Sequence, residues 1–187
     1  MTKSLRLACL AVTLMCIACR KGSGPMSVAG VPGEAFAPLT ETDVARFARA
    51  LPAVVSYVHM RGGPEDNLRL RDSMGAVLAN NIEWVARVDG IDSVLAANGA
   101  DWKFFRSMLY RISVCAWAVG SKDKEHQDEM KQLMRSQPTR AVVTQLRSRQ
   151  RQMKSVVAAV PTSNVETFRR HYQDLRDFFY IVEAGEE

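Results

Sequence analysis

Side chains that could carry out catalysis are few and widely spaced in this chain. Its 187 residues include three histidines and four cysteines. Ser121 and Lys124 have the Ser-x-x-Lys spacing of a serine nucleophile and a lysine base. The Ser-Asp-Asn and Lys-Thr-Gly elements that accompany this pair are missing, so we interpret Ser121 as a helix N-cap. His59 and His171 have no ligand or base at a useful spacing, and the sequence predicts a non-catalytic protein.

Metal-ligating residue types gather in one segment. Glu125, His126 and Glu129 lie close together, and Met130 and Met134 follow one helical turn apart. Di-iron bundles place Glu before His and need two such pairs with two further glutamates. This chain has a single inverted pair, so we interpret the segment as a solvated helix face with a methionine contact stripe. We expect no metal and no cofactor.

The N-terminal segment 1–18 has the composition of a secretory leader. Lys3 and Arg6 supply positive charge ahead of an apolar run over positions 7–18. The run is shorter than the roughly 20 apolar residues that span a bilayer. It ends at Ala18 and is followed directly by Cys19.

Residues 16–19, Cys-Ile-Ala-Cys, resemble the lipobox of bacterial lipoproteins, with Cys16 where the usual pattern has Leu. The resemblance implies that segment 1–18 is removed and that Cys19 carries fatty acyl chains as the first mature residue. Arg20 follows, and by resemblance to enterobacterial sorting this favours the outer membrane. An ordinary signal peptide, an uncleaved membrane anchor and a buried apolar helix are the alternatives.

The mature chain would be a single domain of small net charge. Without segment 1–18, the chain from Cys19 to Glu187 is still long enough to bury one core. The formal charge of +5 falls to +3 without Lys3 and Arg6, so we expect no nucleic-acid partner. Cys115 lies in the apolar run 112–119, where we expect a buried thiol.

Residues 19–38 are expected to form a flexible tether. Segment 20–38 contains three prolines and four glycines among small residues and has no helical or strand periodicity. A coil of this length would reach roughly 25 Å. The folded domain is expected to cover residues 39–187.

Apolar spacing over residues 39–187 predicts an all-α bundle of five to seven helices behind that tether. Caps, glycines and prolines divide it into helices at about 40–58, 65–88, 92–97, 102–119, 122–136, 139–160 and 163–182. Helix 102–119 is apolar around nearly its whole circumference, which predicts that it lies at the centre.

Local signals refine these helices. Thr40 is expected to cap the first helix, and Pro52 to kink or break it. Ser163 and Glu166 have the spacing of a capping box for the last helix. The inward residues of that helix are expected to be Phe168, Tyr172, Leu175, Phe178, Phe179 and Val182.

One predicted helix carries a row of cations. The helical spacing of Arg140, Arg147, Arg151 and Lys154 places all four along one side, opposite the valines. We call these four residues the basic stripe. It could contact anionic lipid headgroups, lipopolysaccharide or an acidic partner. The alternative is the ordinary polar face of a surface helix.

Four aromatic residues form a second candidate site. Trp84, Trp102, Tyr110 and Trp117 follow one another at short intervals in the sequence and could line a pocket between helices. The alternative is that they fill the core.

Together these patterns predict a lipid-anchored protein of the bacterial cell envelope that acts as a non-catalytic interaction or accessory module. Its expected partners are the membrane, through the lipid on Cys19, and an envelope protein or anionic lipid. The alternative is a helical ligand-binding or enzymatic domain that uses the aromatic pocket.

Overall fold

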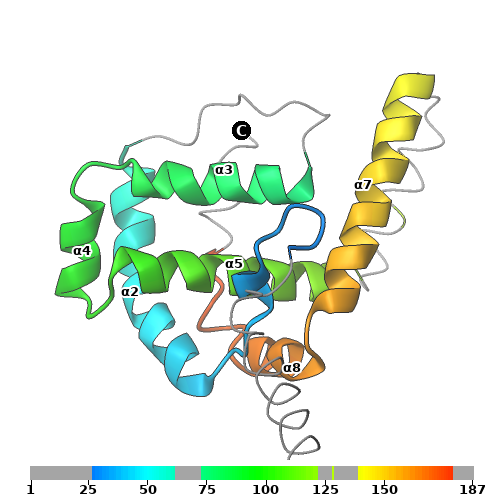
Figure 1. Ribbon diagram of the computed structural model, residues 1–187. Coiled ribbons are helices and arrows are strands. Elements are labelled where there is room, and N and C mark those ends of the chain that lie inside the picture. Colours follow the sequence, from blue (N-terminus) through cyan, green and yellow to red (C-terminus); the bar gives the residue numbers. More distant parts are fainter. Residues whose placement is uncertain (1–26, 62–72, 122–127, 129–138, 179–187) are drawn as a thin grey trace, which may run out of the picture.

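The structure, a computed structural model, describes residues 27–61, 73–121, 128 and 139–178. These residues form six α-helices and one short 3-10 helix, with no β-strand among them. In chain order the elements are η1 (Gly33–Phe36), α2 (Glu41–His59), α3 (Met74–Ala86), α4 (Ile91–Ala97), α5 (Trp102–Gly120), α7 (Arg140–Ala159) and α8 (Thr162–Arg170) (Figure 1). The predicted all-α bundle is confirmed.

Helix α5 lies at the centre of the bundle, as its apolar circumference predicted. Asp101 caps it, because its Oδ1 accepts a hydrogen bond of 2.8 Å from the backbone N–H of Phe104. All six other described elements pack against α5 (Figure 1). The rings of Phe105 and Phe47 lie 4.7 Å apart and join α5 to α2. The buried apolar residues of α5 are Phe105, Met108, Leu109, Tyr110, Ile112, Val114, Cys115 and Ala118.

The folded domain begins earlier than predicted. Residues 27–38, expected to belong to the tether, pack on the bundle. Val28 and Val31 exchange two backbone hydrogen bonds of 3.0 and 2.9 Å, and the Val31 and Ala35 side chains are fully buried. Small residues and prolines suit a tightly turned packed segment as well as a tether, so composition did not distinguish the two. Residues 19–26 lie outside the described residues.

Arg106 of α5 fastens this N-terminal segment to the helices. Its Nη1 donates to Glu34 Oε1 at 2.9 Å, and its Nε donates to Glu83 Oε1 at 2.7 Å. The bond to Glu83 is the main cause of a raised pKa for Arg106. One guanidinium therefore connects η1, α3 and α5 through a half-buried pair of carboxylates.

Pro52 does not break α2. The helix runs unbroken through it, and its axis changes direction partway along (Figure 1). Thr40 caps the helix as predicted, since its Oγ1 accepts from the Asp43 N–H at 3.1 Å. Pro52 is exposed, whereas Leu51 and Val54 are fully buried. Burial of this apolar stripe on both sides of the proline stabilises the helix despite the missing backbone donor.

The last helix differs from the prediction at both ends. Its N-cap is Pro161, which has no side-chain cap bond, and Ser163 and Glu166 are exposed, so the predicted capping box was wrong. The helix ends at Arg170 and continues as turns. Tyr172 is consequently 44% exposed, against the prediction. Phe168, Leu175 and Phe178 are buried as expected, and Phe179 and Val182 lie outside the described residues.

Two predicted helices are described in part or not at all. Of the helix expected over 65–88, the structure describes α3, which Ser73 caps by accepting from the Ala76 N–H at 3.1 Å. The helix expected over 122–136 lies outside the described residues, apart from Asp128. Across the ranges that the structure describes, no helix combines the length and apolar character needed to cross a membrane.

Candidate functional site

The four residues of the basic stripe all lie exposed on α7. Thr139 caps this helix, because its Oγ1 accepts from the Val142 N–H at 3.4 Å. Helix α7 contains five Arg or Lys residues and no Asp or Glu. None of the four stripe residues forms an ion pair within the described part of the chain. Among the described residues, the stripe is thus a row of positive charges without an acidic partner.

The opposite side of α7 attaches it to the bundle. Val156 is fully buried, and Val157 packs against the core. Gln152 Oε1 accepts a hydrogen bond of 3.0 Å from the backbone N–H of Met74, the first residue of α3. Arg149, the fifth cation, is half-buried and lies apart from the stripe. Figure 1 shows α7 at the edge of the bundle, with part of its length extending beyond it.

The four candidate pocket aromatics do not line a common pocket. Trp102 and Trp117 stand near opposite ends of α5, which separates them by about 22 Å along the helix axis. Tyr110, between them, is only 2% exposed, and burial is the main cause of its raised pKa. Trp84, Trp102 and Trp117 are half-buried and pack against the core. The four residues therefore do not share one pocket, because Trp84 lies on α3 and the other three are spread along α5. Their burial matches the alternative that they pack in or against the core.

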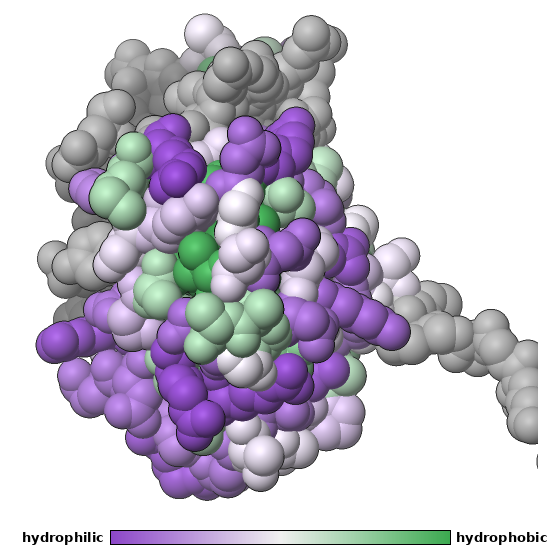
Figure 2. All heavy atoms as spheres, turned by 90° about the vertical axis from the view of Figure 1, so that its left-hand side faces the viewer, coloured by the Kyte–Doolittle hydropathy of each residue, from purple (hydrophilic) through white to green (hydrophobic). Residues whose placement is uncertain are grey.

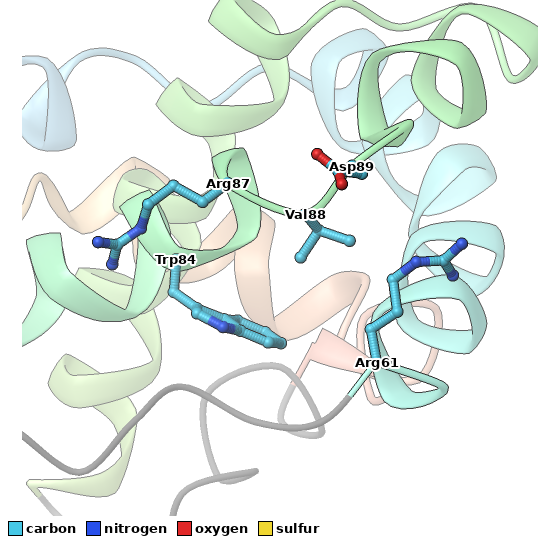
Figure 3. Close-up of a pocket in the computed structure, with 5 residues that line it drawn as sticks. All are labelled: Arg61, Trp84, Arg87, Val88 and Asp89. Atoms are coloured by element: carbon cyan, nitrogen blue, oxygen red, sulfur yellow. The ribbon is translucent and has the colours of Figure 1, made fainter.

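A cavity of about 370 Å³ lies where α2 and α3 end (Figure 3). It is lined by Arg61, Trp84, Arg87, Val88 and Asp89. Only Trp84 had been a candidate from the sequence. Residues 87–89 follow α3, where the only sequence signal was the helix stop at Asp89 and Gly90.

The charged groups around this cavity are directed to its edges. In Figure 3 the guanidinium groups of Arg61 and Arg87 point away from the indole of Trp84. The Arg61 guanidinium instead stacks 3.6 Å from the centre of the Tyr57 ring. The Tyr57 hydroxyl donates to the backbone oxygen of Asp89 at 2.7 Å. The open space faces an indole and a valine, so the arrangement suits a small apolar group and supplies no converging polar chemistry.

An ionic cluster that sequence reasoning missed joins the start of α2 to the end of α8. Glu41 accepts hydrogen bonds from Arg170 and contacts Nε2 of His171, and Nδ1 of His171 lies 3.1 Å from Asp174 Oδ2. The bond from Arg170, followed by that from His171, lowers the pKa of Glu41. The bond to Glu41, followed by that to Asp174, raises the pKa of His171. Glu41 lies 130 residues from His171 in sequence, so spacing gave no signal.

The cluster is an ion-pair network at the surface. Within the described ranges, no group of three or more His, Cys, Asp or Glu residues is arranged to hold a metal ion. His59, the last residue of α2, is exposed. The segment with Glu125, His126, Glu129, Met130 and Met134 lies outside the described residues.

The two remaining candidate nucleophiles in the described residues, Ser121 and Cys115, take part in the packing and capping of α5. Ser121 is the C-cap residue of α5, and its Oγ donates to the Ala118 oxygen at 3.2 Å. The helix that it was expected to open lies outside the described residues. Cys115 is fully buried, and burial raises the pKa of its thiol to about 12. The buried thiol is thus confirmed. Cys19 lies outside the described residues.

The face formed by α2 and α4 has a mixed surface. Figure 2 shows a small apolar area there, enclosed by hydrophilic residues. Enclosed apolar areas of this kind are ordinary on protein surfaces. The basic stripe carries charge of one sign and therefore differs more from an ordinary protein surface than the α2–α4 face does.

Comparisons of the chain with protein-family models, with curated proteins and with solved structures gave no match.

Proposed function

We propose that this protein is a lipid-anchored module of the bacterial cell envelope that acts by contact with other envelope components. The observation that supports the proposal is the leader, with Lys3 and Arg6 before an apolar run and Cys-Ile-Ala-Cys at residues 16–19. Acyl chains on Cys19 would hold the helical body at a membrane, and two or more chains hold far more firmly than one.

The described body adds support for a contact role. It presents a row of exposed cations on α7, and its described aromatic residues other than Tyr172 lie in the core or pack against it. The alternative, a ligand-binding or enzymatic domain, depended on a pocket shared by four aromatics that lie too far apart to form one. The cavity beside Trp84 has one of the four and no converging polar groups.

Mass spectrometry of the protein isolated from bacterial membranes tests the anchor. We expect an N-terminal peptide that begins at Cys19 and carries the added mass of fatty acyl chains. Cys19→Ala should abolish that modification and move the protein out of the membrane fraction. Cys115→Ala, which changes the buried cysteine of α5, is the matched control and should keep the anchor. An unmodified start or an intact leader would refute the proposal.

A further inference from the structure

The N-terminal segment joins the bundle directly beside α7. The backbone oxygen of Ala29 accepts a hydrogen bond of 3.2 Å from the N–H of Gly75. The preceding residue, Met74, donates its own N–H to Gln152 of α7. Two neighbouring residues of α3 thus link Ala29 to Gln152, on the bundle-facing side of α7 and between Arg151 and Lys154 in sequence. Figure 1 shows the same arrangement, with the blue N-terminal segment between the start of α3 and α7.

The length of chain before this point limits how far the body can lie from the anchor. Ser27, where the described chain begins, lies eight positions after Cys19. Even fully extended, eight residues span at most about 29 Å. Under the proposed lipid anchor, the membrane surface therefore lies within that distance of Ser27, which leaves the neighbouring α7 within its reach.

The charge of α7 complements an anionic surface at that position. The stripe from Arg140 to Lys154 extends over about 21 Å of helix, long enough to contact several headgroups. A cation near an anionic bilayer strengthens binding by about fivefold. Arg20 and Lys21, directly after the anchor, would add to this attraction.

The side chains of α7 favour lipid over a protein partner. Its exposed residues other than the stripe are Ala141, Thr144, Gln150, Ser155 and Ala158. None of these supplies the large aromatic anchor that dominates most protein interfaces. None supplies the Trp or Phe that would insert between acyl chains. The exposed face of α7 therefore provides positive charge without large apolar side chains, which suits binding to the headgroup layer of a membrane.

From this placement we propose that the basic stripe binds the anionic phospholipid headgroups of the membrane in which Cys19 is anchored, with α7 lying along the surface. The proposal rests on the lipid anchor for the position of the membrane. It adds to the anchor a second, electrostatic contact that orients the body and decreases as salt screens it.

Lysine labelling of the full-length protein on vesicles tests the orientation. A water-soluble amine reagent would modify Lys154 of the stripe and Lys103, which is exposed at the start of α5, and peptide masses would report each site. Figure 1 places the start of α5 at the opposite end of the bundle from α7, so Lys103 serves as an internal reference. The vesicles would contain phosphatidylcholine alone or an equimolar mixture with phosphatidylglycerol.

We expect Lys154 to be protected relative to Lys103 on the anionic vesicles only, and the protection to disappear at high salt. Equal labelling on both kinds of vesicle, or protection that salt does not change, would overturn the proposal. Protection that needs added envelope proteins, and does not occur with anionic lipid alone, would overturn it in favour of an acidic protein partner.

Two double variants that remove the same number of charges distinguish an effect of the stripe from an effect of net charge. Arg147→Gln with Arg151→Gln removes two stripe cations and should weaken binding by about 25-fold, enough to remove the protection of Lys154. Arg49→Gln with Arg169→Gln removes two exposed cations from α2 and α8 and should keep the protection. An equal effect of both pairs would contradict a specific role of the stripe.

The two proposals can fail separately. Acylation of Cys19 is measured by the mass of the mature N-terminus, and docking by the labelling ratio of Lys154 to Lys103. An acylated protein with an unprotected Lys154 retains the anchor and overturns the docking. A protected Lys154 in a protein without acyl chains supports docking of α7 and overturns the anchor.

Discussion

Asn164 of α8 holds Leu39, the residue just before the cap of α2, through its side chain. Its Oδ1 accepts a hydrogen bond of 2.9 Å from the Leu39 N–H, and its Nδ2 donates to the Ala37 oxygen at 2.8 Å. Asn164 is 1% exposed, and 125 residues separate it from Leu39. Buried amides need such partners. The contact therefore fastens the N-terminal segment to the last described helix.

Asn164→Ala should lower the free energy of unfolding by about 2 to 4 kcal/mol, because the Leu39 N–H and the Ala37 oxygen lose their partner in the interior. Urea denaturation measures the change. Asn98→Ala is the matched control, since the Asn98 side chain donates to the Val94 oxygen within its own helix end, and we expect a loss below about 1 kcal/mol. Similar losses in both variants would contradict the role given to Asn164.

Gly75 should resist replacement by alanine even though it lies in a helix. A Cβ atom there would come within 2.0 Å of the Gly30 carbonyl carbon and 2.4 Å of the Val31 nitrogen, both backbone atoms. Gly→Ala in a helix interior usually stabilises by roughly 1 kcal/mol. Here we expect a loss of about 1 to 3 kcal/mol, because the backbone of the N-terminal segment must move away. Thermal denaturation reports the sign.

Gly120→Ala provides the comparison for Gly75. Gly120 is also helical, and a Cβ there would meet no atom within 4 Å. We expect this variant to be neutral or slightly more stable than the parent protein. A destabilised Gly120→Ala, or an unaffected Gly75→Ala, would count against the close approach of residues 30 and 75.

The contact between His171 and Glu41 should make stability depend on pH. The raised pKa of His171 means that its stabilising effect is complete below its ordinary value of 6.5 and is lost as the pH rises through the higher folded value. The lowered pKa of Glu41 means that its effect is present above 4.5 and is lost as the pH falls through the lower folded value. The contact should therefore stabilise the fold most between these two pH values.

NMR titration of His171 tests this directly, and we expect a midpoint above 6.5. Glu41→Gln should move the midpoint downwards, because the bond to Glu41 is the main cause of the shift. In urea denaturation, His171→Gln should remove the fall in stability that the parent protein shows as the pH rises above 6.5. A midpoint at or below 6.5 in the parent protein would falsify the assigned contact.

Cys115 should be inert towards thiol reagents in the folded protein. Its side chain is fully buried, and its pKa of about 12 leaves almost no thiolate at neutral pH. We expect peptide mapping to show modification of Cys115 only after unfolding in urea. Rapid modification of the native protein would show that α5 is less enclosed than the structure indicates.

The sequence by itself determined the class of fold and most helix starts. Thr40, Asp101 and Thr139 each accept a hydrogen bond from a backbone N–H three residues on, so the signal and its partner lie within one turn. The apolar circumference of α5 likewise identified the central helix. Both are short-range properties of the chain, which is why spacing predicted them.

Only the tertiary structure decided which distant residues meet. Glu41 and His171 gave no signal in the sequence, because 130 residues separate them and each suits an ordinary surface position. The packing of residues 27–38 was missed for a similar reason, since Val31 and Ala35 become buried only when this segment packs against the helices of the bundle. Long-range contacts depend on how whole helices pack, and local composition does not encode that arrangement.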